Sequence, residues 1–150
     1  MKHFLSYFND SIKTHWELPA VTNFGSETYT YGQMAEGIEK YHIFFEKAGI
    51  KKGDKVALYA RNSAEWAIAY FATLTYDAVT VPFLPDFLPA SVVELSCFSD
   101  CKVIIADEVA IKGIKSDEKL PAYSKLTVCE LMDEPFAKTP KLSITRFMYK

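Results

Sequence analysis

The feature that most constrains the fold is an alternation of short apolar runs and longer helical patterns between residues 55 and 106. The runs at 55–60, 78–84 and 102–106 predict strands, and the stretches at 62–74 and 90–98 have helical length and spacing. Strands joined through helices pair in parallel, with right-handed crossovers. The order therefore predicts an α/β fold, an open, mostly parallel sheet with flanking helices.

The N-terminal third predicts a helix, a β-hairpin and a second helix. Residues 4–12 have a rough helical spacing, and 21–24 and 28–31 alternate around Gly25-Ser26, which fits a tight turn. Thr30 and Gln33 then form a T-x-x-Q capping box for a helix that ends at Gly49. Its predicted buried positions recur at three- and four-residue intervals: Tyr31, Met34, Ala35, Ile38, His42, Phe45 and Ala48. His42 is interpreted as a packed, hydrogen-bonded residue.

The helix after the first strand is predicted to begin with an N-x-x-E pattern formed by Asn62 and Glu65, and it is apolar almost all round. Pro82 places the second strand at an edge, or at its own end, because proline donates no ladder hydrogen bond. The third helix is expected to bury Val92, Val93 and Leu95. Residues 107–124 are predicted to be irregular, and 125–131 are compatible with a fourth strand. The expected α/β unit covers 1–135, and 136–150 are expected to form an irregular tail.

Composition restricts the partners and the compartment. The chain has 17 basic and 19 acidic residues, a net charge of −2, and no long run of Lys or Arg, so no nucleic-acid partner is expected. The longest apolar run, 66–74, is too short for a transmembrane segment, and the first residues lack a signal-peptide pattern. Three cysteines fit a reducing compartment, so a cytoplasmic location is expected. Cys97 and Cys101 could share a helix face, but metal-ligand spacing is missing.

Tests for known catalytic and nucleotide-binding patterns assign no residue. The segment 49–55 is not G-x-x-x-x-G-K-[ST], and it precedes a strand, so it is not a phosphate loop. Ser63 follows a strand but lacks the flanking glycines of G-x-S-x-G, and Asn62 and Ser63 are ordinary helix-capping types. The carboxylate pairs lie in polar stretches and are interpreted as solvated: Asp107-Glu108, Asp117-Glu118 and Asp133-Glu134. No catalytic, cofactor-binding or metal-binding residue is predicted.

Four segments, taken in order, resemble one family. They are Thr-Tyr-Gly-Gln-Met from Thr30, Gly-Ile-Lys-Lys-Gly-Asp-Lys-Val from Gly49, Asn-Ser-Ala-Glu-Trp from Asn62, and Val81-Pro82. Together, over roughly residues 17–106, the chain resembles the start of the AMP-forming acyl-CoA synthetases, the adenylate-forming superfamily. The segment PFLPDFLPASV is similar to the long-chain fatty acid CoA ligases. Asp77 departs from the pattern, since the family usually has glycine before Ala-Val.

The resemblance implies a partial N-terminal domain of the adenylate-forming fold. The family activates a carboxylate with ATP and Mg²⁺ to an acyl-adenylate, then transfers the acyl group to CoA. Its Ser/Thr/Gly-rich loop ending in Pro-Lys-Gly, and its later catalytic residues, have no counterpart here. The resemblance therefore predicts part of a fatty acid–CoA ligase that is inactive alone and uses no cofactor by itself.

Two other functions stay open. One is an interaction or oligomerisation module without catalysis, which would form a homo-oligomer through surfaces that the rest of the parent enzyme would cover. The other is a small flavodoxin-like enzyme that binds FMN or ATP. A yellow preparation, or a thermal shift on adding either ligand, would identify that third class.

Overall fold

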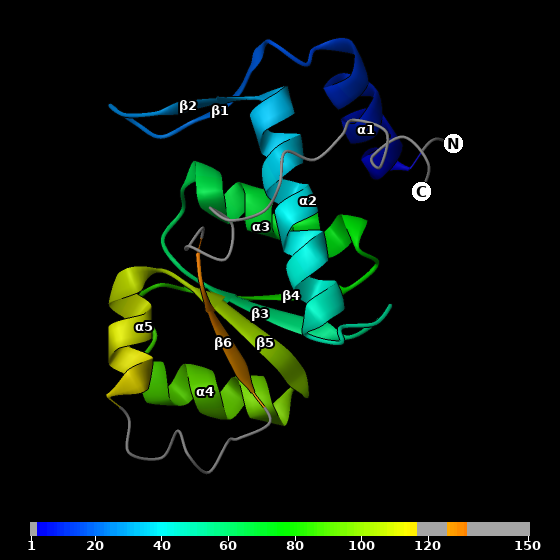
Figure 1. Ribbon diagram of the computed structural model, residues 1–150. Helices are drawn as coiled ribbons and strands as arrows, with labels where there is room; N and C mark the ends of the chain where they lie inside the picture. The colour runs from blue at the N-terminus through cyan, green and yellow to red at the C-terminus, as the bar shows by residue number, and fades with distance from the viewer. Residues whose placement is uncertain (1–2, 117–125, 132–150) are drawn as a thin grey trace.

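The structure is a computed structural model that describes residues 3–116 and 126–131, shown in Figure 1. Four parallel strands form the main sheet in the order β4-β3-β5-β6, and β1 and β2 form a separate antiparallel hairpin. The predicted α/β class, parallel sheet and hairpin are thus confirmed. The elements are α1 Phe4–Thr14, β1 Pro19–Thr22, β2 Thr28–Thr30, α2 Tyr31–Lys47, β3 Lys55–Tyr59, α3 Ala64–Thr75, β4 Val79–Phe83, α4 Pro89–Phe98, β5 Cys101–Ala106, α5 Glu108–Lys115 and β6 Thr127–Glu130.

The strand order explains which helices cover which face of the sheet. The chain moves from β3 to β4 through α3, then reverses direction, passes through α4 to reach β5 on the other side of β3, and continues through α5 to β6. Since parallel crossovers keep one hand, the reversal sends α4 and α5 to the face opposite α3. Figure 1 shows α2 and α3 on one side of the sheet and α4 and α5 on the other.

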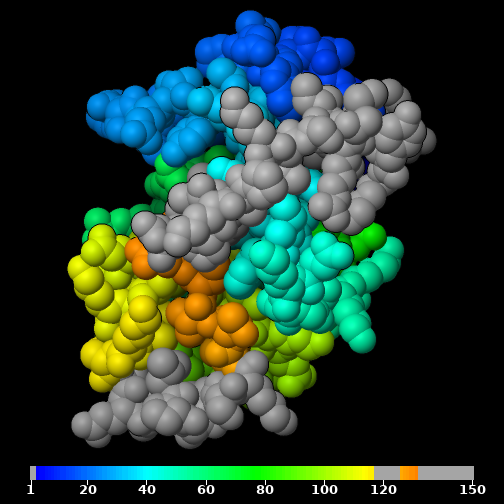
Figure 2. All heavy atoms as spheres, viewed as in Figure 1, coloured from blue at the N-terminus to red at the C-terminus, as the bar shows by residue number. Residues whose placement is uncertain are grey.

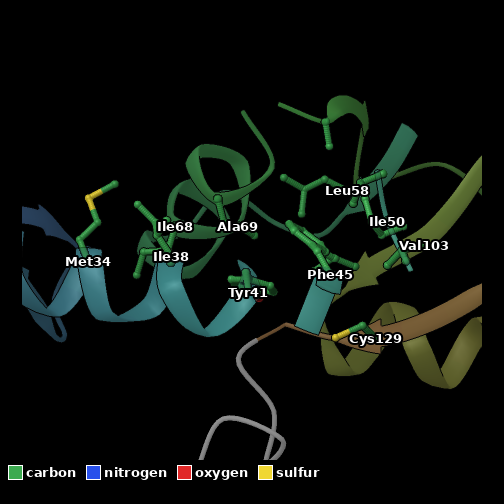
Figure 3. Close-up of a cluster of buried hydrophobic side chains, with 14 residues drawn as sticks. Met34, Ile38, Tyr41, Phe45, Ile50, Leu58, Ile68, Ala69, Val103 and Cys129 are labelled. Carbon is green, nitrogen blue, oxygen red and sulfur yellow. The ribbon is translucent and has the colours of Figure 1, made fainter. Parts of the chain in front are cut away.

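The face covered by α2 and α3 contains the larger core. Met34, Ile38, Tyr41 and Phe45 of α2 line up against α3 and the sheet, as Figure 3 shows. The α2 surface approaches α3 closely at Gly37, where an added Cβ would lie 2.8 Å from Ile68 Cγ2. The predicted stripe omitted Tyr41, which is fully buried.

The opposite face has a thinner core. Ala57, Tyr59, Ile104 and Ala106 of the sheet pack against buried residues of the two covering helices, Val92, Val93, Ile111 and Ile114. These residues alternate along β3 and β5 with those of the first core, as expected for a sheet buried on both faces. The two helices approach closely at Gly113, where an added Cβ would lie 2.6 Å from Pro89 Cγ.

The hairpin and α1 add an outer layer beyond α2 and α3, visible as the blue segments in Figures 1 and 2. Phe8 of α1 stacks on Phe71 of α3, with ring centroids 4.2 Å apart. Asn23, at the end of β1, binds the start of α3: its Oδ1 accepts from the Ala64 amide at 2.7 Å. This layer therefore covers the exposed side of α3.

Several local predictions are confirmed. Thr30 and Gln33 form the capping box of α2. Gly49 has φ 72°, and the Ile50 amide donates to Phe45 O in the pattern of a Schellman end. His42 Nε2 lies 3.1 Å from Ala72 O and 3.0 Å from Thr75 Oγ1, so this histidine is packed and hydrogen-bonded. Pro82 lies in β4, at an edge of the described sheet.

Other predictions are wrong. Residues 108–115, expected to be irregular, form α5, because Asp107 caps the helix and Ile111 and Ile114 supply a buried side. Ser63, not Asn62, is the N-cap of α3, since its hydroxyl accepts from the Trp66 amide.

Two predictions about α4 and its surroundings are also wrong. Val92 and Val93 are fully buried as predicted, but Leu95 is 41% exposed and Ser96 occupies the third buried position. Cys97 lies in α4 whereas Cys101 begins β5, so the two cysteines share no helix face. The predicted tail at 136–150 and the carboxylate pairs at 117–118 and 133–134 lie outside the described residues.

Candidate functional site

The reversal of strand order creates the best candidate site. In open α/β sheets, ligands bind beyond the carboxyl ends of the strands, at the point where two neighbouring strands continue into helices on opposite faces of the sheet. Here that point lies between β3 and β5, beyond Tyr59 and Ala106. A cavity of about 110 Å³ lies there, lined by Tyr59, Ala60, Arg61, Pro85, Pro89, Asp107, Val109 and Ala110.

Asp107 organises this pocket. One carboxylate oxygen accepts from the Ala110 amide at 2.9 Å and caps α5, and the other accepts from the Arg61 amide at 3.1 Å. The side chain thus ties the segment after β3 to the helix after β5. Predicted as a solvated charge, Asp107 is instead a structural link across the strand ends.

Tyr59, the last residue of β3, also lines the pocket. Its hydroxyl donates to Phe87 O at 2.6 Å and so holds the loop between β4 and α4 against the end of β3. Burial raises the pKa of Tyr59, and the nearby charges of Asp107 and Asp86 raise it further. The phenol therefore stays protonated and keeps its role as a donor at neutral pH.

The pocket can bind a small group, and its two titratable residues without a positive charge, Tyr59 and Asp107, are both engaged in hydrogen bonds within the fold. Among the eight described residues that line it, none is a cysteine, serine, histidine or lysine. Asp107 already accepts from the Ala110 amide at the start of α5, and the exposed side chain of Arg61 is the positive group of the lining. The arrangement can recognise a small polar or negatively charged group.

The polar cluster at the start of α3 is structural. Tyr29 Oη donates to Glu65 at 2.6 Å, and Asn23 Nδ2 donates to both Glu65 oxygens at 3.2 Å. Partial burial by itself raises the pKa of Glu65, but the hydrogen bonds from Tyr29, Asn23 and Ser63 outweigh it and hold that pKa below its usual value. Glu65 therefore stays ionised and fixes the hairpin to α3.

The structure brings none of the rejected sequence candidates into a reactive arrangement. Ser63 caps a helix, as its residue type predicted, and His42 contacts backbone and Thr75. Within 3–116 and 126–131 no group of three or more His, Cys, Asp or Glu side chains could hold a metal ion. Arg61 and Asp107 were missed as a pair because they become neighbours only when β5 lies beside β3, which the sequence does not specify.

Comparison with known proteins identifies the family. The sequence model described as "AMP-binding enzyme" matches residues 8–146, nearly the whole chain. The chain belongs to the AMP-binding enzyme family. The family resemblance predicted from the four sequence segments is therefore confirmed.

Curated relatives of this AMP-binding enzyme chain include several CoA ligases. The chain is 27% identical over 118 residues to the long-chain-fatty-acid–CoA ligase heimdall of Drosophila melanogaster. The match covers 76% of this chain and 17% of that relative. It is 29% identical over 116 residues to the acetyl-coenzyme A synthetase of Photobacterium profundum, spanning 73% and 17%. The chain therefore covers about a sixth of these relatives' length.

Solved structures agree on the fold. Coronafacic acid ligase from Pectobacterium brasiliense superimposes with a TM-score of 0.78 at 18% identity, over 95% of this chain and 31% of that one. The N-terminal domain of FACL13 from Mycobacterium tuberculosis gives 0.76 at 22% identity, over 93% and 36%. These adenylate-forming neighbours show the same strand and helix arrangement, within a larger domain.

The family departure at Asp77 has a structural explanation. Asp77 has φ 61°, the left-handed conformation that glycine adopts freely, and its carbonyl accepts from the Gly53 amide at 2.8 Å. Aspartate tolerates this conformation better than most residues. The turn into β4 is thus kept without glycine.

Of the helices in the part of the chain that the structure describes, none is long and apolar enough to span a membrane.

Proposed function

We propose that the chain is the N-terminal part of an AMP-forming ligase that activates a fatty acid with ATP and transfers it to CoA. The observation that carries the proposal is the family match over residues 8–146. The choice of fatty acid rests on the similarity to the long-chain ligase and on the segment after β4.

These 150 residues by themselves are proposed to be catalytically silent. The sequence has six glycines, and none belongs to a Ser/Thr-rich loop ending in Pro-Lys-Gly. The pocket at the strand ends offers a cation and hydrogen-bonding groups but no nucleophile or metal cluster. Binding and positioning are the roles such a site can fill.

The direct test is an assay of ATP-dependent acyl-CoA formation by the purified chain, with a complete fatty acyl-CoA synthetase as the positive control. We expect no product above background from the chain and full activity from the control. Acyl-CoA made by the chain alone would refute catalytic silence.

A chimaera tests the ligase assignment itself. Residues 8–131 would replace the matching segment of the long-chain relative, and the chimaera would be assayed with palmitate and with acetate. Activity with palmitate and not with acetate supports the proposal. A folded chimaera that prefers acetate would contradict the fatty-acid assignment.

A second candidate function is self-association without catalysis. Large apolar side chains are exposed on β4 and α4 and in the loop between them, where a parent enzyme of greater length could cover them: Val79, Leu84, Phe87, Leu88, Leu95 and Phe98. A concentration-dependent rise in mass, measured by light scattering, is expected. A constant monomer mass would exclude this candidate.

We further propose a cytoplasmic location and no nucleic-acid partner. The three free cysteines fit a reducing compartment, and the charge of −2 gives no basic surface for a phosphate backbone. Fractionation of cells that express the tagged chain tests the first point, and retention on heparin or DNA resin tests the second.

A further inference from the structure

Helix α4 has two apolar stripes where a helix on a sheet needs one. Val92, Val93 and Ser96 face the sheet and are fully buried. A second stripe runs along the outer side through three large apolar residues, Leu88 at the N-cap, Leu95 and Phe98, with the half-buried Ser91 among them. Leu88 is 71% exposed, Leu95 41% and Phe98 88%. In the part of the chain that the structure describes, these three large side chains stay exposed.

The spacing of the outer stripe is that of a helix–helix contact. Its members are separated by three, four and three residues, the a/d spacing of a coiled-coil seam. Such positions align along about 15 Å of one helix side, since the rise is about 1.5 Å per residue. The stripe therefore fits a second helix better than an extended strand or a flat surface.

The stripe is also self-complementary. Leu88 and Phe98 lie five residues on either side of Val93, and Ser91 and Leu95 lie two residues on either side. In an antiparallel pair of α4 helices, Leu88 of one copy meets Phe98 of the other, and Ser91 meets Leu95. Each large side chain thus faces a different partner, and the small serine leaves room for Leu95.

We propose that a second copy of this chain docks on the outer stripe of α4, antiparallel, about a two-fold axis level with Val93. This inference deepens the self-association proposed above by naming its surface. Standard interfaces bury about 800 Å² per partner. The largest apolar patches on monomers cover roughly 300–600 Å². Leu88, Leu95 and Phe98, with Phe87 and Leu84 in the loop before α4, form a small apolar contact, so we expect a weak dimer.

The test exploits the Ser91–Leu95 pairing. The full chain and the variants Ser91→Lys and Leu95→Glu would be compared by sedimentation velocity over a series of micromolar concentrations. Each variant alone places a charge in the apolar seam, and we expect its dimer to weaken by about tenfold or more. Mixed in equal amounts, the two should form a heterodimer, because the introduced lysine then faces the introduced glutamate across the antiparallel seam.

A matched control is Phe24→Glu, which puts the same charge on another exposed apolar residue, in the turn between β1 and β2. It should dimerise as the unmodified chain does. Circular dichroism and urea unfolding of every variant check that the fold is kept, as expected for substitutions on the outer side of a helix or in an exposed turn.

The outcomes separate this inference from the broader proposal. If the unmodified chain stays monomeric at every concentration, both self-association and the α4 surface are refuted. If it dimerises but Leu95→Glu leaves the dimer intact, or weakens it no more than Phe24→Glu does, self-association stands and the α4 surface is refuted. If the two single variants are monomers that do not combine when mixed, the antiparallel register is wrong. Loss of the dimer in each and recovery in the mixture support the proposal.

Discussion

The two faces of the sheet are built differently. On one face, α2 and α3 cover a core that includes the fully buried Tyr41 and Phe45 of α2, and α1 and the hairpin add a further layer. On the other face, α4 and α5 cover a core of smaller side chains and expose Leu95, Phe98 and Val109 to solvent. The sheet therefore has a thick face, covered by α2, α3, α1 and the hairpin, and a thin face, covered by α4 and α5. The difference indicates where stability and where contacts with other chains originate.

The first test of this difference removes one large buried side chain from the core on each face of the sheet. Phe45 is fully buried and packs edge-on against Tyr76, with ring centroids 5.3 Å apart. Phe45→Ala should lower the free energy of unfolding by about 3–5 kcal/mol, from lost burial and the cavity left behind. Ile114→Ala, fully buried on the other face, should cost about 2–4 kcal/mol. Urea denaturation measures both.

Phe45→Leu keeps the comparison measurable if the alanine variant fails to fold, and it should cost less than Phe45→Ala. An Ile114→Ala variant less stable than Phe45→Ala would show that the thin face, and not the α2–α3 face, dominates folding.

A pair of glycines tests how rigid each helix contact is. In an open helix position, glycine to alanine stabilises by up to about 1 kcal/mol. At Gly37 the new Cβ would meet Ile68 Cγ2 at 2.8 Å, inside a contact buried from both sides. Gly37→Ala should therefore destabilise by about 1–3 kcal/mol, because the core has no room to adjust.

Gly113→Ala is the matched variant on the thin face, with Pro89 Cγ 2.6 Å from the new Cβ. α5 spans eight residues and is partly exposed, so it can shift, and we expect a smaller loss than at Gly37. Thermal unfolding of both variants decides the order. Equal losses would mean that the thin face is as rigid as the thick one.

The third prediction removes the contact that joins the hairpin to the thick face. Glu65→Gln keeps a group that can accept from Tyr29 but directs an amide toward the amide of Asn23. We expect a loss of about 1–2 kcal/mol in the free energy of unfolding at neutral pH. The exposed substitution Glu36→Gln on α2 serves as the control and should leave stability nearly unchanged.

The same contact sets a pH dependence. Because the pKa of Glu65 is lowered in the folded chain, its contribution is complete above its unfolded pKa, about 4.3, and disappears as the pH falls through the folded value. Stability measured between neutral and acidic pH should therefore fall less steeply in Glu65→Gln than in the unmodified chain. Identical pH profiles would show that the cluster contributes nothing to folding.

The sequence predicted most of this architecture because the signals were local. The capping box at Thr30, the end at Gly49 and the strand–helix alternation each depend on neighbouring residues. α5 was missed because eight residues with two buried isoleucines give too short a period to recognise. The pocket was missed because it requires β5 to lie beside β3, and Leu95 was assigned to the buried side of α4 although Ser96 fills that position. Long-range order, not local preference, determines both.

The smallest expected effect comes from the ends of the two helices that flank the reversal. Asp77 follows α3 with φ 61°, and Asp100 follows α4 with φ 59°. The left-handed conformation costs a non-glycine residue about 1–2 kcal/mol, less for aspartate, while glycine loses more entropy on folding. Asp77→Gly and Asp100→Gly should each raise the free energy of unfolding by about 0.5–1 kcal/mol.

The ion pair of Asp77 with Lys52 will not cancel this gain, since both side chains are mostly exposed and such pairs contribute little. Because the strain is local, the two gains should be equal although the faces differ, and differential scanning calorimetry would show similar increases in melting temperature. Asp77→Asn, which also tolerates the left-handed conformation but loses the charge, separates the two contributions: stability should stay near that of the unmodified chain. A destabilised Asp77→Gly together with a destabilised Asp77→Asn would mean that the carboxylate, and not the backbone, determines this turn.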